Sequence, residues 1–453
     1  MYVSRLRIDG IRGFHGPRQV DLTLTRPDGT HAGWTVVAGR NGSGKTTLLR
    51  TLAMLVAPYS TATLVGDPGP MVTTGSDSAV ALFRARLEPD GTAAAPGGTA
   101  GRPEEKDFGV KIFPGDRPGG DALVLDIGGG AHALDVPDGD RLPVRSAQHP
   151  GADRGARGWF SAGYGPFRRM TGEGAGADSR YTPRAERFAT LFDESASLSE
   201  SVSWLVRQHL RRLEEREGAQ ELLDAVFALL GDGLLPDGHR IVRVDSDGLW
   251  VSRRGQEFPL REMSDGYRTV ASLVVDLVRH LQEHFGSLRM DLSGGTPVVP
   301  LPGVVLIDEV DVHLHVSWQQ RIGEWLKTHF PRIQFIVTTH SPYVCQAADP
   351  GGLVRLPGPD EDAPPVVVDE DLYRRVVYGS GDDAVLSDLF GLDSPYSPRA
   401  ERLRRRVGDL EGRVLEGEAS ETEVEEYRAL SDVLNSSLGA RVDEVATRLG
   451  RSA

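Results

Sequence analysis

A glycine-rich segment between an apolar strand and an amphipathic helix constrains the fold of this chain more than any other feature. Residues 39–46 read Gly-Arg-Asn-Gly-Ser-Gly-Lys-Thr and match the pattern G-x-x-x-x-G-K-[ST] without a mismatch. The apolar run at 34–38 predicts a strand, and leucines at helical spacing over 46–56 predict a helix. This strand–turn–helix context is typical of a loop whose backbone N–H groups wrap around phosphates.

The chemistry of that loop gives each residue type a role. Lys45 is expected to reach the β- and γ-phosphates, and Thr46 to place its hydroxyl on Mg²⁺. The alternative, a chance glycine-rich turn, is disfavoured by the strand before it and the helix after it. We therefore predict ATP and Mg²⁺ as cofactors. The predicted nucleotide-binding residues of this segment are Gly39, Arg40, Asn41, Gly42, Ser43, Gly44, Lys45, Thr46 and Thr47.

A second apolar strand, 304–307, ends in the carboxylate pair Asp308 and Glu309. The carboxyl end of a buried parallel strand lies at the ligand crevice of the sheet. Asp308 is predicted to hold Mg²⁺ together with Thr46, and Glu309 to polarise the attacking water. Solvated acids at a strand end are the simpler alternative, which the upstream phosphate loop makes less attractive.

A histidine ends the next predicted strand. His340 follows the run 335–339 and comes 32 residues after Asp308, which leaves room for one helix and one strand. It is predicted to sense the γ-phosphate, although a hydrogen-bonded histidine at a strand end would look the same. The predicted catalytic residues are thus Glu309, Lys45 and His340.

Two segments compete as the serine-containing motif that contacts a nucleotide from a second protomer. Leu292-Ser293-Gly294-Gly295 looks like the LSGG of ABC transporters, but Pro297, Pro300 and Pro302 forbid the helix that must follow. Ser264 instead opens an apolar-striped helix predicted over 263–285. Ser264 and Gly266 are therefore predicted to bind ATP held by the other chain, with a plain N-cap as the alternative.

These pieces, in this order, resemble the ABC-type ATPase head of the SMC/RecF-like and OLD-like families. The opening Leu6-Arg7-Ile8 and Ile11-Arg12-Gly13-Phe14 are similar to the first strand of that head, and 308–319 is similar to the OLD-like acidic run. The resemblance implies an α/β fold: a mixed N-terminal sheet, a parallel P-loop core sheet flanked by helices, an inserted helical lid and a helical tail. It also implies that Arg12 helps to hold the nucleotide, and that residues 311–315 cross a dimer interface.

The tail resembles that of ATPase subunits in bacterial anti-phage systems, notably Septu-type and retron-associated ones. The residues that carry this are Tyr378-Gly379, Val385-Leu386 and Phe390-Gly391, followed by a charged helical pair. The resemblance implies a homodimer or higher homo-oligomer that controls an effector, a nuclease or toxin from the same operon. Only 108 residues follow Cys345, most of them helical in pattern, so no intrinsic TOPRIM nuclease is expected.

A RecF-like, DNA-binding repair ATPase is the alternative. Five arginines could form its phosphate-binding patch, although solvated helix and turn charges explain them as well. The net charge of −14 argues against a chain coated for nucleic acid but leaves room for a local basic groove. A transporter subunit fits poorly. The five arginines are Arg207, Arg211, Arg212, Arg253 and Arg254.

Composition and the positions of the predicted loops set the remaining expectations. A single cysteine in 453 residues excludes an internal disulfide, and neither a signal peptide nor an apolar run of about 18 residues is visible, so a cytoplasmic protein without membrane contact is expected. Segments 91–106, 114–121, 172–180 and 350–365 are predicted loops, and 316–330 one helix. Four parts are predicted: 1–182 with the P-loop, a lid at 183–240, a second ATPase lobe at 241–366, and a tail at 367–453.

Overall fold

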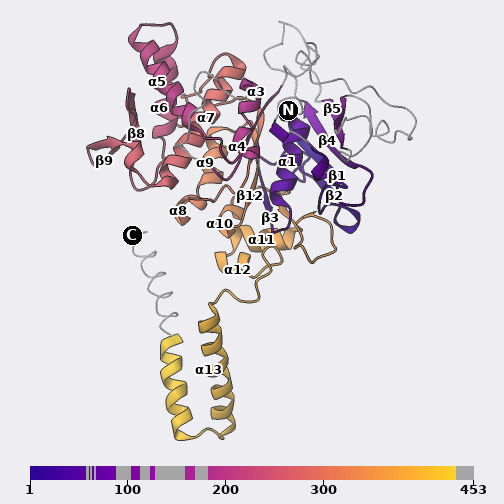
Figure 1. Ribbon diagram of the computed structural model, residues 1–453. Coiled ribbons are helices and arrows are strands. Elements are labelled where there is room, and N and C mark those ends of the chain that lie inside the picture. The colour runs from indigo at the N-terminus through magenta and orange to yellow at the C-terminus, as the bar shows by residue number, and fades with distance from the viewer. Residues whose placement is uncertain are drawn as a thin grey trace. The chain divides into compact units, whose positions relative to one another are not determined.

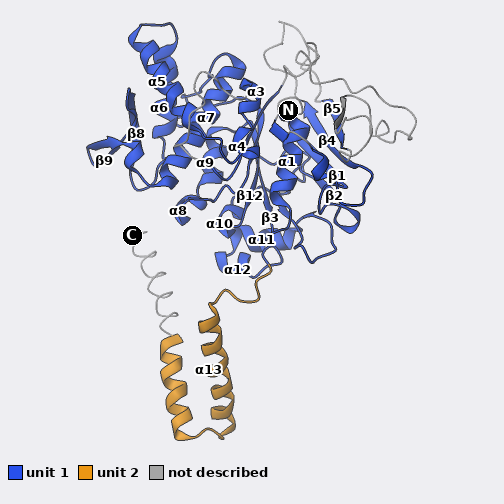
Figure 2. Ribbon diagram, viewed as in Figure 1, with its two compact units in different colours: residues 1–390 blue, residues 391–453 orange. Residues whose placement is uncertain are grey.

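The computed structural model describes residues 1–57, 61, 64–65, 68–87, 104–112, 123–127, 159–168 and 182–434, with 123–127 as backbone only. The chain forms two compact units, residues 1–390 and 391–453, shown in different colours in Figure 2. The first unit holds every predicted site residue. The four-part division predicted from the sequence stays a prediction.

The first unit is organised around a six-stranded sheet in the order β14-β13-β3-β12-β11-β7. All neighbouring strands pair in parallel except β14, which is antiparallel to β13. The carboxyl ends of the parallel strands therefore lie along one edge, as Figure 1 lets the reader follow. The strands are β3 (Trp34–Ala38), β7 (Phe160–Tyr164), β11 (Gly303–Ile307), β12 (Ile333–Thr339), β13 (Leu353–Arg355) and β14 (Val366–Val367).

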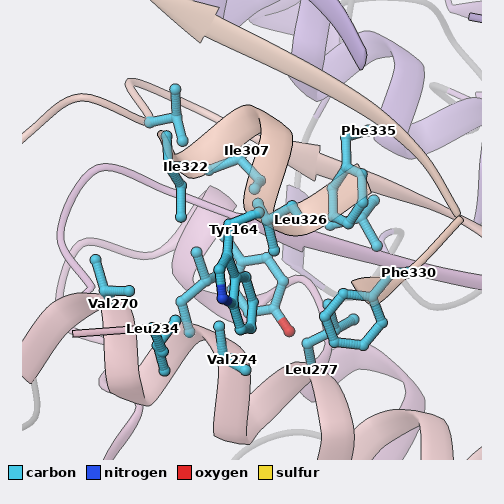
Figure 3. Close-up of a cluster of buried hydrophobic side chains, with 14 of the residues drawn as sticks. Tyr164, Leu234, Val270, Val274, Leu277, Ile307, Ile322, Leu326, Phe330 and Phe335 are labelled. Carbon is cyan, nitrogen blue, oxygen red and sulfur yellow. The ribbon is translucent and has the colours of Figure 1, made fainter. Parts of the chain in front are cut away.

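The central strands β3, β11 and β12 are buried throughout and mostly apolar because both faces of the sheet are covered. Along β11, Val305 and Ile307 belong to one hydrophobic core, whereas Val304 and Leu306 belong to another. The first core is completed by the helix α7 (Asp265–Phe285), and Figure 3 shows Ile307 in the same cluster as Val270, Val274 and Leu277 of that helix. The second is completed by α1 (Lys45–Val56).

A second, five-stranded sheet lies beyond α1, in the order β2-β1-β4-β5-β6, with every pair antiparallel. Its inward residues share the core of α1. The strands are β1 (Tyr2–Asp9), β2 (Val20–Thr23), β4 (Ala79–Leu87), β5 (Glu104–Ile112) and β6 (Leu123–Ile127). The mixed α/β architecture predicted for the head is confirmed.

The region predicted as a lid begins with four helices, α3 (Pro183–Glu186), α4 (Ala189–Phe192), α5 (Ser199–Leu213) and α6 (Ala219–Gly231). A three-stranded antiparallel sheet follows: β8 (Arg240–Asp245), β9 (Gly248–Arg253) and β10 (Gln256–Pro259). A 3₁₀ turn at Leu260–Glu262 then leads into α7.

An ion cluster is buried along α7. Asp276 lies 3.1 Å from a guanidinium nitrogen of Arg279 and 3.2 Å from Nε2 of His280, and Arg279 also binds Glu186 of α3 at 2.7 Å. Asp276 and Arg279 are at most 5% exposed at the side chain, and His280 is fully buried. The cluster fixes α7 to the start of the helical region.

The structure corrects several sequence expectations. The predicted loop 350–365 contains β13, and the predicted loop 91–106 ends inside β5. The helix expected over 316–330 is two helices, α8 (Val316–Gln319) and α9 (Ile322–His329). The segment 292–295 is a turn, which agrees with rejecting it as a helix start. The predicted loops 114–121 and 172–180 lie outside the described residues. The helix α3 follows the second of them.

Three short helices complete the first unit: α10 (Pro342–Cys345), α11 (Glu370–Tyr378) and α12 (Gly381–Val385). Residues 386–397 are not helical, so the tail predicted as helical over 367–453 is interrupted there. In the second unit, α13 (Pro398–Glu416) and a helix at 421–434 are joined by an Arg406–Glu426 ion pair of 2.6 Å. No helix in the described part of the chain is both long and apolar enough for a membrane span.

Candidate nucleotide-binding site

The phosphate loop connects β3 to α1 at the carboxyl edge of the main sheet. Gly42 and Gly44 have φ angles of +78° and +98°, values that glycine adopts without the penalty of a side chain. The Lys45 ammonium donates to the carbonyl oxygens of Gly39 at 2.9 Å and Arg40 at 3.1 Å. The loop thus curls around its own lysine, which is 7% exposed.

The phosphate loop packs against Phe14, a residue of the motif at the start of the chain. A Cβ atom at Gly44 would lie 2.7 Å from Cζ of Phe14, so the ring is in contact with the loop backbone. Phe14 is 2% exposed and belongs to the core of α1. Through Phe14, the sequence Arg12-Gly13-Phe14 therefore contributes an apolar surface on which the phosphate loop packs. The sequence analysis did not assign this role.

The acid pair and the phosphate loop meet directly. Thr46 Oγ1 donates to Asp308 Oδ2 at 2.7 Å, and Thr338 Oγ1 of β12 donates to Asp308 Oδ1 at 2.5 Å. The backbone N–H of Glu309 donates to the same threonine oxygen at 2.8 Å. The residues predicted to share Mg²⁺, Thr46 and Asp308, are thus brought together although 262 positions separate them.

The acidic residues of the site shift the pKa values of the ionisable groups near them. Burial raises the pKa of the Glu309 carboxyl, and the nearby carboxylates Asp308 and Asp311 raise it further. Burial lowers the pKa of the Lys45 ammonium, while the same acids oppose that shift. A raised carboxyl pKa beside a buried lysine is the environment that general acid–base groups require.

The residues fit a magnesium–nucleotide complex. Ser43 Oγ is buried without a hydrogen-bond partner, so the loop has an unused polar group where a phosphate would lie. Three carboxylates, Asp308, Glu309 and Asp311, face Lys45 and leave an excess of negative charge suited to a divalent cation. Thr46 and Asp308 would hold Mg²⁺, and Lys45 with the loop N–H groups would hold the phosphates. The bound nucleotide would supply the γ-phosphate to be transferred.

One functional residue was not assigned from the sequence. Arg168, just after β7, is 2% exposed and donates to the carbonyl oxygens of Gly165 at 2.8 Å, Asp308 at 2.8 Å and Glu309 at 3.0 Å. The sequence analysis assigned no role to the run Gly163-Tyr164-Gly165-Pro166-Phe167-Arg168-Arg169. The tyrosine–glycine–proline signal marks a turn, but nothing in it shows which arginine turns inward.

The remaining predicted residues lie at the margins of the site. His340 follows β12 directly, and partial burial and Lys45 lower the pKa of its imidazole. Arg12 is exposed, at a φ of +47°. Arg40 and Asn41 are also exposed, and Thr47 lies in the first turn of α1, where its carbonyl accepts from Thr51.

The start of α7 has an unusual geometry. Ser264 occupies the N-cap position, yet its hydroxyl makes no capping hydrogen bond and its side chain is exposed. A Cβ atom at Gly266 would lie 2.3 Å from the carbonyl oxygen of His313. The start of α7 therefore packs directly on the segment 311–315, which the resemblance placed at a dimer interface.

The DNA-binding alternative from the sequence gains little support. The region 199–257 carries eight arginines against eleven acidic residues, a net charge of −3. Arg207 is 3.6 Å from Glu200, which neutralises part of the predicted DNA patch. Within the described residues, no group of three or more His, Cys, Asp or Glu is placed to hold a metal ion by itself, so the Mg²⁺ site described above would need Thr46 and the phosphates beside Asp308. His315 caps α8.

Comparison with known proteins agrees with this geometry. The family model "AAA domain, putative AbiEii toxin, Type IV TA system" matches residues 164–346, and a second, "AAA domain", matches residues 5–62. Together these segments contain every predicted site residue.

Individual relatives point the same way. The Septu protein PtuA of Bacillus thuringiensis is 33% identical over 175 residues, covering 37% of this chain and 41% of that protein. The probable ATPase of retron Ec83 of Escherichia coli is 42% identical over 103 residues, covering 22% and 17%. The chain thus matches less than half of the length of either relative.

A solved SMC head domain from Thermotoga maritima covers 82% of this chain and all of its own, at 16% identity and a TM-score of 0.43. The family segments and the named relatives agree with the motifs and with the sheet that joins them. Over these segments the chain is therefore similar in sequence to AAA-domain proteins and to the Septu and retron ATPases.

Proposed function

We propose that this protein hydrolyses ATP between two copies of itself and thereby controls an effector, most simply a nuclease, in anti-phage defence. The observation that carries the hydrolytic part is the 2.7 Å hydrogen bond between Thr46 and Asp308. It unites the phosphate loop with a carboxylate pair whose second member, Glu309, has a raised pKa. That arrangement can bind Mg²⁺, position a γ-phosphate and accept a proton from water.

Ser264 supports the shared site. A serine at the start of a 21-residue helix, with its hydroxyl exposed and not engaged in capping, is available to an anion from outside the chain. In the proposed dimer, each site combines Lys45, Thr46, Asp308 and Glu309 of one chain with Ser264 of the other. ATP closes the dimer, and hydrolysis opens it.

The test of hydrolysis is Glu309→Gln, with Glu324→Gln on α9 as the matched control. Removing the charge of Glu309 should abolish turnover, while ATP binding persists and traps a dimer. Glu324 is 65% exposed, and its one ion pair among the described residues is with Lys327 on its own helix, so its variant should hydrolyse ATP at the wild-type rate. Wild-type turnover by Glu309→Gln would refute the proposed role of this residue.

The test of the shared site is complementation between two inactive chains. Lys45→Ala and Ser264→Arg should each be inactive alone. Mixed together, they form heterodimers with one intact site, so up to a quarter of wild-type activity should return at equal mixing. If no activity returns although both variants fold and mix, Ser264 does not act across a dimer.

The effector is sought by purifying tagged Glu309→Gln with its neighbouring gene products in Mg-ATP. Mass spectrometry should find a stoichiometric nuclease or toxin. The defence role is supported by the relatives named Septu PtuA and retron ATPase. Co-purification of DNA alone would favour the RecF-like alternative instead, and its arginines would become the next residues to test.

A further inference from the structure

The side chain of Arg168 holds the backbone of the acid pair. Its guanidinium lies between three carbonyl oxygens, of Gly165, Asp308 and Glu309, at 2.8 to 3.0 Å. Two of these belong to consecutive peptide units, so one rigid, planar group fixes two neighbouring carbonyls at once. Because the residue is 2% exposed, water does not compete for these hydrogen bonds.

The backbone that Arg168 holds is strained. Glu309 has a φ of +45°, in the left-handed region that non-glycine residues seldom adopt. Such a conformation persists only where its surroundings determine it, and strained residues of this kind cluster at functional sites. Here the N–H of Glu309 is held by Thr338 and its carbonyl by Arg168. Both sides of the strained residue are thus fixed by side chains.

The surroundings of Arg168 also stabilise its positive charge. Burial lowers the pKa of the guanidinium to about 10, while the carboxylates Asp308, Asp311 and Glu309 oppose that shift. The side chain therefore stays protonated near neutral pH. A buried cation with no acidic side chain in direct hydrogen-bond contact would be costly, but three backbone carbonyls and three nearby carboxylates compensate.

We propose that Arg168 is a positioning residue for hydrolysis, one that fixes the backbone of Glu309 so that its carboxylate meets the attacking water. This inference rests on the proposed function, because it assumes that Glu309 acts in hydrolysis. Arg168 contacts no predicted phosphate ligand of the loop among the hydrogen bonds of the described residues, so it acts on the chemical step and not on nucleotide affinity.

The test compares Arg168→Met and Arg168→Lys with the control Arg187→Met in the full-length protein. Arg187 is a half-buried arginine near the opposite end of β7, with its guanidinium 5.3 Å from the ring of Phe160. For each variant, kcat, the dissociation constant for Mg-ATP and the melting temperature are measured. Misplacement of a reacting group by about 1 Å costs on the order of 10²-fold in rate.

We expect Arg168→Met to lose about 10²-fold in kcat while its ATP dissociation constant stays within about threefold of wild type. Arg168→Lys should recover part of the rate, because an ammonium can reach only some of the carbonyls. Arg187→Met should keep the wild-type rate. An unchanged kcat in folded Arg168→Met, or a loss that lies in ATP affinity, would overturn the proposal. If Arg168→Met does not fold, the same criteria apply to Arg168→Lys.

A double-mutant cycle separates this inference from the proposed function. If Arg168 acts through Glu309, then Arg168→Met should have almost no further effect in a Glu309→Gln background, measured in single turnover. Additive losses would overturn the inference and leave Glu309 in place. Full activity of Glu309→Gln alone would instead overturn the proposed function.

Discussion

Asp276 is the carboxylate on which the buried ion cluster of α7 depends. It forms an ion pair with Arg279 and lies 3.2 Å from His280, and it is 3% exposed. In Asp276→Asn both partners stay buried and lose their most buried counter-charge, so that Arg279 keeps only Glu186 and His280 only Glu283 among the ion pairs of the described residues. Breaking a buried ion pair in this way costs about 3–5 kcal/mol, a large part of a typical total of about 5–15 kcal/mol.

The cost should depend on pH, and the sign follows from His280. Burial lowers the pKa of its imidazole, but Asp276 and Glu283 outweigh burial and raise it. A raised folded-state pKa contributes stability that is present below the unfolded value of about 6.5 and is lost as pH rises through the folded value. The wild-type free energy of unfolding should therefore fall over this range, and Asp276→Asn should show a shallower slope, because Glu283 then acts on His280 without Asp276.

The measurement is denaturant unfolding followed by tryptophan fluorescence at pH 6 and pH 9. All six tryptophans lie within residues 1–390, so the signal reports on the first unit. Asp224→Asn, an exposed substitution on α6, is the control and should stay within about 0.5 kcal/mol of wild type. A loss below about 1 kcal/mol in Asp276→Asn, or an unchanged pH slope, would refute the reasoning.

Three shorter predictions concern the packing around the site. Phe14→Ala removes the apolar surface on which Gly44 packs and should cost about 3–5 kcal/mol of stability and weaken ATP binding; wild-type ATP affinity would contradict this. Gly266→Ala places a Cβ against the His313 carbonyl and should abolish hydrolysis while one chain still binds ATP, with unchanged turnover as the contrary result. Cys345 is fully buried with a raised thiol pKa, so a thiol reagent should label it only at the rate of unfolding.

The core of the site could be predicted because its residues are close in sequence to strong signals. The phosphate loop follows a strand with no polar interruption except Thr35, and Asp308 follows an apolar run that can only be buried. Two parallel strands of one sheet end at the same edge, so their terminal residues must meet. The 2.7 Å contact between Thr46 and Asp308 agrees with that topology.

The missed features lack such a signal. β13 is three residues long, in a segment rich in glycine and proline, and it pairs because β3 offers an open edge. The interruption between α8 and α9 falls at Gln320 and Arg321, where no proline or glycine announces it and the apolar spacing continues. The inward orientation of Arg168 is determined by the carbonyls that surround it. Tertiary contacts decide all three.

The division of β11 between two hydrophobic cores has a consequence for motion. A shift of β11 by one residue would move Val304 and Leu306 into the core that now holds Val305 and Ile307, and the reverse. Such a shift would disrupt the packing of both cores. The packing of β11 therefore fixes the position of the backbone that carries the acid pair. In the proposed nucleotide cycle, movement is therefore expected in the loops and helices that approach Asp308 and Glu309, while the backbone at the end of β11 keeps its place.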